Sequence, residues 1–146
     1  MIALIQRVTE ASVVVDGETV GAIGPGLLAF IAVQPEDGEK QARRMLERLL
    51  GYRVFADAEG RMNRALSDTG GGLLLVSQFT LAADTAKGTR ASFTRAASPE
   101  HARQWFDRLV ELARDTHPGV ETGRFRAHME VRLTNDGPVT FWLEAR

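Results

Sequence analysis

The chain has 146 residues, 44% of them hydrophobic and 25% charged, with a formal net charge of −1, which predicts one globular domain spanning residues 1–146. The absence of cysteine excludes disulfides, thiolate catalysis and cysteine-based zinc sites, and the three histidines lack metal-ligand spacing, so we expect no metal and no cofactor. No apolar run is long enough to cross a bilayer, no secretory signal is visible and no positive excess favours general nucleic-acid binding, so we expect a cytoplasmic protein without membrane contact, whose RNA contacts are local.

The N-terminal part is predicted to consist of strands. Residues 2–8 and 11–24 indicate a strand followed by a hairpin, because Asp16-Gly17 is favourable turn chemistry between two alternating runs. Residues 26–33 form a continuous apolar run, which is typical of a strand that is buried on both faces.

Two segments show the spacing of amphipathic helices. Residues 35–51 change to helical periodicity and Gly51 is placed to end the helix. Residues 98–116 begin with Ser98 as N-cap and Pro99 at the first helical position. The buried faces are predicted to consist of Ala42, Met45, Leu46 and Leu49 in the first helix and Ala102, Trp105, Phe106, Leu109 and Ala113 in the second.

The remaining segments are expected to add strands and a polar loop. Residues 70–93 contain a glycine-rich entry, a buried strand and a loop, while residues 127–134 and 139–145 alternate in hydrophobicity and are expected to pair with each other. The predicted fold class is α/β, with an antiparallel-rich sheet, compatible with a barrel-like form, and two main helices.

The turn predicted between the last two strands contains a contradiction. Asn135-Asp136-Gly137 is strong turn chemistry for a hairpin, but Pro138 has no N–H to close the loop against Asn135. From the residues alone, an edge-strand proline or a bulge is the preferred interpretation.

Polar residues that could carry chemistry follow the buried strand in "LLLVSQFTL". Ser77, Gln78 and Thr80 stand at its end, where such residues usually satisfy backbone groups. Ser77 or Thr80 as a nucleophile would need a base, and no histidine or carboxylate lies at a recognisable offset. Backbone N–H groups at a strand end can form an oxyanion hole without a particular side chain.

Two loops carry cations that could contact phosphate. Lys87 and Arg90 lie on one loop and Arg124 and Arg126 on another, although each of them alone is most simply a solvated loop charge. Phe125 follows Arg124 on a turn-like segment, where an aromatic ring serves either as a core plug or as a stacking surface for a nucleobase.

Three segments together resemble the D-aminoacyl-tRNA deacylase family over essentially the whole chain. They are "MIALIQRVTEASVVVDGE" at the start, "VSQFTL" in the middle and "LTNDGPVT" near the end. The family's SQxxL pattern fits residues 77–81 and its NxGPxT pattern fits residues 135–140. Ser77 favours the D-specific branch, because a related family that edits L-alanine has proline there. Arg126 departs from the resemblance, since the family commonly has glycine at that position.

The resemblance implies a fold, an assembly and an activity. The fold would be the barrel-like deacylase fold, and the enzyme would hydrolyse the ester between a D-amino acid and the 3′ end of tRNA, which is a proofreading reaction. The Gly137-Pro138 peptide would be cis, a state that proline permits at low cost, and would complete the active site of the partner in a homodimer.

The resemblance also implies roles for individual residues. Carbonyls of Gly137 and Pro138 would accept the substrate ammonium and exclude an L side chain, so that glycyl-tRNA would also be cleaved. Backbone N–H groups around Phe79 and Thr80 would bind the oxyanion, Ser77 and Gln78 would hold the adenosine end, and the tRNA 2′-hydroxyl would help to activate water. Phe125 and Met129 would form the pocket wall, and Arg7 is a candidate for bracing the Gly-Pro loop.

Two other hypotheses remain open at the level of sequence. A non-enzymatic RNA-binding module would use Lys87, Arg90 and Arg124 without needing the Gly-Pro loop. A generic esterase would use Thr80 or Ser77 as a covalent nucleophile and would be indifferent to the RNA 2′-hydroxyl.

Overall fold

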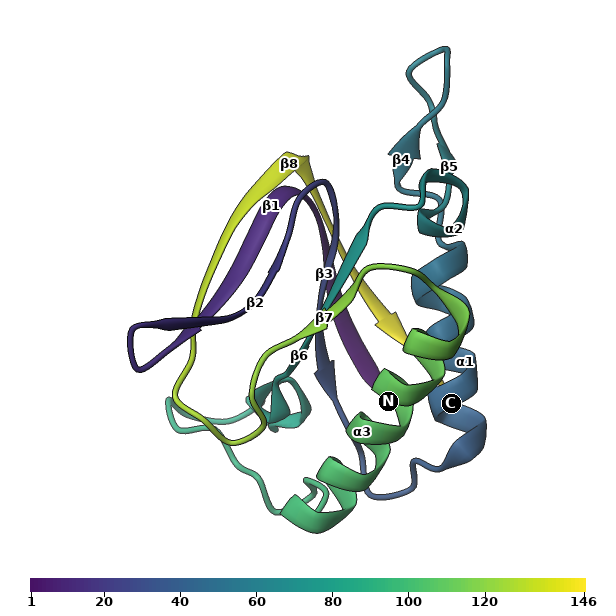
Figure 1. The fold of residues 1–146 in the computed structure, drawn as a ribbon. Helices are drawn as coiled ribbons and strands as arrows, with labels where there is room; N and C mark the ends of the chain where they lie inside the picture. Colours follow the sequence, from purple (N-terminus) through teal and green to yellow (C-terminus); the bar gives the residue numbers. More distant parts are fainter.

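A curved, mostly antiparallel sheet forms the frame of the molecule, as a computed structural model describing residues 1–146 shows (Figure 1). The strands are β1 (Ile2–Val15), β2 (Glu18–Ile23), β3 (Gly26–Ala32), β6 (Gly72–Ser77), β7 (Val120–Thr122) and β8 (Glu130–Glu144). β2 and β3 pair with one edge of β1, β8 pairs with its other edge, and β6 and β7 continue the sheet from β3. Only the β3/β6 and β6/β7 pairs are parallel.

The length of β1 makes the sheet nearly close into a barrel. β3 pairs with the first half of β1 and β2 with the second half of the same edge, so that the sheet bends back on itself. Gly21 of β2 consequently lies against the carbonyl of Thr122 in β7, where an added Cβ would collide with the backbone. The α/β, barrel-like class predicted from the sequence is confirmed.

Two long helices lie side by side against one face of this sheet (Figure 1). They are α1 (Glu39–Gly51) and α3 (Pro99–Thr116). As predicted, Ser98 caps α3, its Oγ accepting from the His101 backbone N–H at 3.2 Å, and α1 ends at Gly51. Arg108 of α3 binds both carboxylate oxygens of Glu39 at 2.8 and 2.9 Å and so ties the two helices together.

The alternation of side chains along the strands produces two hydrophobic clusters on opposite faces of the sheet. In β6, Leu73 and Leu75 face the helices, while Leu74 and Val76 face the inside of the curve. The predicted faces of both helices lie in the larger cluster, with Ala102 and Trp105 half-buried at its edge. The inner cluster is smaller and leaves room for a pocket.

The predicted hairpin between the last two strands is wrong. Residues 130–144 form one strand, β8, which runs antiparallel to β1 along its whole length. Residues 2–15 are likewise one strand and not two segments. A long partner strand offers more hydrogen bonds than a short local hairpin, so the turn chemistry at 135–137 produces a bulge within β8 instead.

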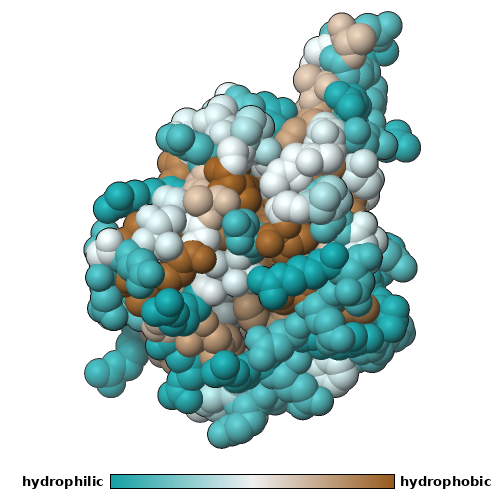
Figure 2. All heavy atoms as spheres, viewed as in Figure 1, coloured by the Kyte–Doolittle hydropathy of each residue, from teal (hydrophilic) through white to brown (hydrophobic).

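Besides β7, four further elements had no prediction. They are β4 (Phe55–Ala56) and β5 (Met62–Arg64), the one-turn helix α2 (Leu66–Thr69) and the 3-10 turn η1 (Phe79–Ala82). The β4–β5 hairpin projects from the body and is largely hydrophilic (Figures 1 and 2). The Asn63 side chain donates to Asp57 within it, which holds the pKa of that carboxyl below its usual range. No helix is long and apolar enough to cross a membrane.

Candidate functional site

A pocket of about 440 Å³ opens where β6 leaves the sheet. It is mostly apolar and is formed by the ends of β3 and β6, the start of α3 and the segment that precedes and begins β8. Its lining residues are Ile31, Val33, Val76, Ser77, Gln78, Phe79, Ala97, Pro99, Ala102, Phe125, Arg126, Ala127, His128, Met129 and Val131. The structure therefore gathers five of the predicted site residues, Ser77, Gln78, Phe79, Phe125 and Met129, around one cavity.

The pocket floor is set by the parallel pairing of β6 with β3. Ser77 stands opposite Ile31 as the last residue of β6, and the Gln78 N–H donates to the Ile31 carbonyl at 2.7 Å. After Gln78 the chain turns out of the sheet into η1, so the polar residues of the SQxxL pattern reach the pocket because a buried apolar strand ends there.

Two backbone donors at the start of η1 have no acceptor. The N–H groups of Phe79 and Thr80 precede the hydrogen bonds of the 3-10 turn, and no carbonyl or side chain in the chain accepts from either of them. The Gln78 side-chain amide donates to the Thr80 hydroxyl and so holds the turn. Adjacent free N–H groups beside a pocket can stabilise a developing oxyanion.

No nucleophile–base pair is formed in the pocket. The Thr80 hydroxyl hydrogen-bonds only to Gln78, and the Ser77 hydroxyl has no hydrogen-bonding partner. His128 lines the same cavity, but no hydrogen bond joins it to either hydroxyl. A serine or threonine nucleophile activated by a neighbouring base is therefore not supported by the geometry.

The opposite wall is a tight turn between β7 and β8. The Arg124 N–H donates to the Met129 thioether, and the Ala127 N–H to the Arg124 carbonyl. Phe125 packs against Phe106 of the core, with ring centroids 6.3 Å apart, and also lines the cavity. The ring therefore fills part of the core, one of the two roles that the sequence left open, and its accessible part contributes to the pocket wall. Whether it stacks on a base stays a prediction.

Gly137 and Pro138 lie outside this pocket. The register of β8 on β1 jumps from Val8↔Asn135 to Gln6↔Thr140, so residues 136–139 bulge out of the ladder opposite Arg7. Asp136, Gly137 and Pro138 are exposed, and the Gly137-Pro138 peptide is cis, as the resemblance implies. Within one chain, neither residue lines the cavity.

The bulge is held by two side chains. Arg7 donates to the Asp136 carbonyl at 3.1 Å, lies 3.3 Å from the Asp136 carboxylate and also donates to the Val54 carbonyl at 2.7 Å. Asn135 closes the base, because its amide donates to the carbonyls of Arg7 and Val139 at 2.9 and 3.0 Å. Sequence reasoning proposed Arg7 for this bracing and missed Asn135, although the turn motif contains it.

The predicted RNA-binding cations do not line the pocket. Lys87 and Arg90 occupy a loop whose base is fastened by two backbone hydrogen bonds between Asp84 and Ser92, each of 2.9 Å. Arg124 is exposed on the turn beside the cavity. Arg126, which the sequence offers with Arg124 as a loop cation, does line the cavity, and so does His128, which was not predicted; both lie within the turn that carries Phe125 and Met129.

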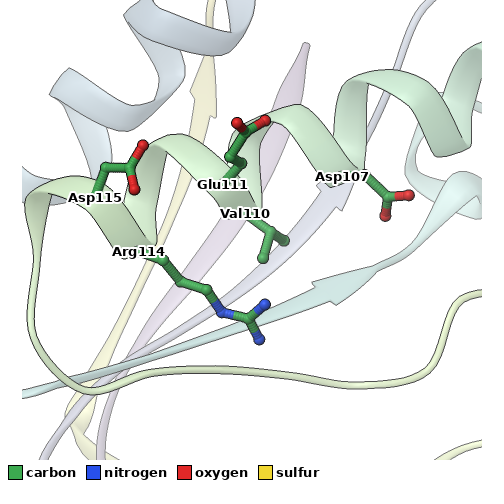
Figure 3. Close-up of a pocket in the computed structure, with 5 residues that line it drawn as sticks. All are labelled: Asp107, Val110, Glu111, Arg114 and Asp115. Atoms are coloured by element: carbon green, nitrogen blue, oxygen red, sulfur yellow. The ribbon is translucent and has the colours of Figure 1, made fainter.

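A second depression, of about 300 Å³, runs along α3 (Figure 3). Its lining residues are Asp107, Val110, Glu111, Arg114 and Asp115, all from that helix. It contains no predicted site residue, and three carboxylates against one guanidinium disfavour an anionic ligand such as RNA. We therefore place the candidate site in the pocket at the end of β6.

Comparison with known proteins gives a consistent result along the whole chain. The family model described as D-Tyr-tRNA(Tyr) deacylase matches residues 4–144. A D-aminoacyl-tRNA deacylase of Thioalkalivibrio sulfidiphilus is 70% identical over 144 residues, covering 99% of this chain and 97% of that protein. One of Stenotrophomonas maltophilia is 68% identical, covering 98% of this chain and 99% of that protein.

Two solved structures share the fold. One, described as a c-Myc DNA Unwinding Element Binding Protein, superposes with a TM-score of 0.95 at 38% identity, covering 100% of this chain and 99% of the other. The second, described as a probable eukaryotic D-amino acid tRNA deacylase, has a TM-score of 0.82 at 16% identity and covers 98% of each chain. At that identity the second likeness concerns the fold alone.

Proposed function

Because the chain belongs to the D-Tyr-tRNA(Tyr) deacylase family and is a D-aminoacyl-tRNA deacylase, a hydrolase of aminoacyl-tRNA, we propose that its chemistry takes place in the pocket at the end of β6. The substrate is the ester between a D-amino acid and the terminal adenosine of tRNA. The products are the free D-amino acid and tRNA, and the biological outcome is proofreading of chirality in the cytoplasm, where aminoacyl-tRNA is used.

The observation that carries this proposal is the pair of free N–H groups of Phe79 and Thr80 at the pocket. Water adds to the ester carbonyl, and the carbonyl oxygen becomes an oxyanion that accepts hydrogen bonds from these two donors. The carbon–oxygen bond to the ribose then breaks, and the departing ribose oxygen takes up a proton. No side-chain base hydrogen-bonds to Ser77 or Thr80, so we assign part of the activation of the water to the neighbouring 2′-hydroxyl of the tRNA.

We assign the discrimination between D and L substrates to the β8 bulge of a second copy of the chain. Gly137 and Pro138 are exposed and protrude from the ladder, yet do not reach the pocket of their own chain. In an isologous homodimer, each bulge completes the pocket of the other subunit. Its carbonyls accept the substrate ammonium and occupy the space that an L side chain would need.

The remaining predicted residues are assigned to the nucleotide end. Ser77 and Gln78 hold the adenosine and the loop, Phe125 stacks on adenine and Met129 completes the wall. Lys87, Arg90 and Arg124 are exposed cations, and we assign them to contacts with phosphates further along the RNA.

A binding role without catalysis is a second candidate. It is favoured by the likeness to the protein described as a DNA unwinding element binding protein, whose chain superposes over the full length. Such a role would use the exposed cations and would not need the free N–H groups or the bulge. The esterase alternative lacks a comparable observation.

The decisive experiment compares purified protein on D-alanyl-, L-alanyl- and glycyl-tRNA, with release of the amino acid measured over time. We expect hydrolysis of the D and glycyl esters and rejection of the L ester, since exclusion of an L side chain cannot reject a substrate without a side chain. Cleavage of none of the three would favour the binding role. Rejection of glycyl-tRNA together with cleavage of D-alanyl-tRNA would show that the pocket binds the D side chain itself. Exclusion of an L side chain by the bulge would then be wrong as the basis of selectivity.

A further inference from the structure

Arg126 has a backbone conformation that an arginine rarely adopts. Its φ is +62°, in the left-handed region where a Cβ is crowded by the backbone. Glycine adopts this region freely, so the turn geometry by itself selects glycine at this position. An arginine retained in an unfavourable conformation at a pocket is a reason to look for a role of its side chain.

The other non-glycine residue with positive φ has a local explanation. Asp16 has φ +49° in the two-residue turn between β1 and β2, where a short polar side chain tolerates this conformation. The long side chain of arginine offers no such compensation. Arg126 also makes no hydrogen bond or ion pair through its guanidinium, unlike Arg103 and Arg132 on the flanking elements, which pair with Asp107 and Glu130.

The position of Arg126 fits a cation at the entrance of the pocket. It is exposed, lines the cavity and directly follows Phe125, the proposed stacking surface for adenine. An apolar cavity can hold the aminoacyl group and the nucleobase, but the phosphate of the terminal nucleotide keeps its charge and must remain at the polar entrance. A guanidinium can bind such a phosphate with two parallel hydrogen bonds.

We infer that Arg126 is a substrate-binding residue that contacts the phosphate joining the terminal adenosine to the preceding nucleotide. This inference rests on the proposed function and deepens it, because it assigns a chain-specific contact to the RNA end of the substrate. The residue binds the ground state and the transition state alike, so its loss changes KM and leaves the chemical step unaltered.

The test compares Arg126→Asn, Arg126→Gly and Arg126→Lys in steady-state hydrolysis of D-aminoacyl-tRNA at several salt concentrations. Asparagine and glycine tolerate the left-handed conformation, so both variants should fold. We expect each to raise KM about tenfold with kcat unchanged and to reduce the slope of log KM against log salt by about 0.7, the value for one phosphate contact on a single strand. Lysine should retain the slope.

The matched control is Arg114→Gln, which removes an exposed, unpaired cation of α3 that lines the second depression (Figure 3) and not the pocket at the end of β6. It should leave KM and the salt slope as in the wild type. Wild-type KM and slope in Arg126→Asn and Arg126→Gly would overturn the inference while leaving the deacylase proposal intact. If the wild type cleaves no D-aminoacyl-tRNA, the proposed function fails. The phosphate contact can still be tested by measuring the binding of uncharged tRNA at several salt concentrations. Unchanged affinity and salt dependence in Arg126→Asn would refute that contact.

Discussion

Ser77 and Thr80 carry hydroxyl groups in the segment that supplies the proposed oxyanion donors, but neither is arranged as a nucleophile. Thr80 accepts a hydrogen bond from Gln78, and no imidazole or carboxylate contacts either hydroxyl. The groups that are free to act are the backbone N–H donors of Phe79 and Thr80. At the scale of single residues, the proposed catalysis therefore depends on the backbone and on the substrate more than on side chains.

Because the backbone and the substrate are proposed to supply the catalytic groups, the effect of removing each hydroxyl can be predicted. Ser77→Ala and Thr80→Ala should each retain kcat within about tenfold of the wild type, because the backbone donors remain. Replacing the terminal 2′-hydroxyl of the tRNA by hydrogen should lower the rate by about 10³-fold or more, the range expected when an acid–base group and its positioning are lost together. Single-turnover deacylation measures both effects. A Thr80→Ala enzyme that folds and binds tRNA but is inactive would refute the mechanism.

At the scale of elements, α1 and α3 are joined by the ion pair of Glu39 with Arg108. The Arg108 hydrogen bonds are the largest cause that lowers the pKa of Glu39 to about 2, from its ordinary value of 4.5, and the same bonds raise the pKa of Arg108. Arg43 adds a second cation 2.7 Å from Glu39. The pair is partly exposed, so solvent screening reduces its contribution to stability.

The lowered pKa predicts a pH dependence of stability with a defined sign. Because the folded-state pKa lies below the unfolded value, the contribution of Glu39 is fully present above pH 4.5 and is lost as the pH falls toward about 2. Glu39→Gln should therefore lower Tm at pH 7 and show a smaller further decrease than the wild type between pH 4.5 and 2.5. Thermal denaturation followed by circular dichroism measures this difference. Parallel curves for the two proteins would contradict the assignment.

The second element with a specific prediction is the β8 bulge. Asn135→Asp keeps the side-chain shape but replaces the amide that donates to the Arg7 and Val139 carbonyls with a carboxylate that faces them. We expect kcat/KM for D-aminoacyl-tRNA to fall at least about tenfold and discrimination against the L ester to weaken, because small displacements of positioning groups have large rate effects.

The matched control for Asn135 is Thr140→Val. It removes the hydroxyl that donates to the Asn135 side-chain oxygen at 3.2 Å but leaves both amide donations in place. Its effect on the ratio of D to L hydrolysis should be clearly smaller. If Asn135→Asp changes thermal stability alone and leaves that ratio as in the wild type, Asn135 is structural and does not position the bulge for catalysis.

At the scale of the whole molecule, the predicted site falls into two separate parts. The pocket lies at the end of β6, while the Gly137-Pro138 bulge protrudes elsewhere on the same chain. Two copies of the chain related by a two-fold axis can bring the parts together twice, giving two equivalent composite sites.

A subunit-exchange experiment tests this arrangement. Ala102→Phe should fill the pocket, and Gly137→Ala should distort the bulge, because an added Cβ would meet Val139 at 2.8 Å and Arg7 at 2.9 Å at a φ of +128°. Each variant alone should be inactive. After exchange, half of the dimers are mixed and each has one intact site of two, so about a quarter of wild-type activity should return. No recovery despite demonstrated exchange, or full activity in a monomer, would contradict composite sites.

The sequence by itself determined the parts of the structure that depend on local pattern. Helical spacing and the Ser98-Pro99 start located α3, and the continuous apolar run located β3, because burial on a face imposes a period that neighbouring residues reveal. The position of Ser77 and Gln78 at the end of a buried strand was also predictable. The family resemblance, shown by the matches along the whole chain, supplied the activity that periodicity could not.

Only the tertiary structure decided which distant segments meet. The turn chemistry at 135–137 predicted a hairpin, but pairing of β8 with β1, more than a hundred residues earlier in the chain, turned it into a bulge held by Arg7 and Asn135. The entrance position of Arg126 likewise depends on how the turn before β8 packs against the end of β6. Such contacts are decided by the total of long-range hydrogen bonds and burial, which no local window of sequence contains.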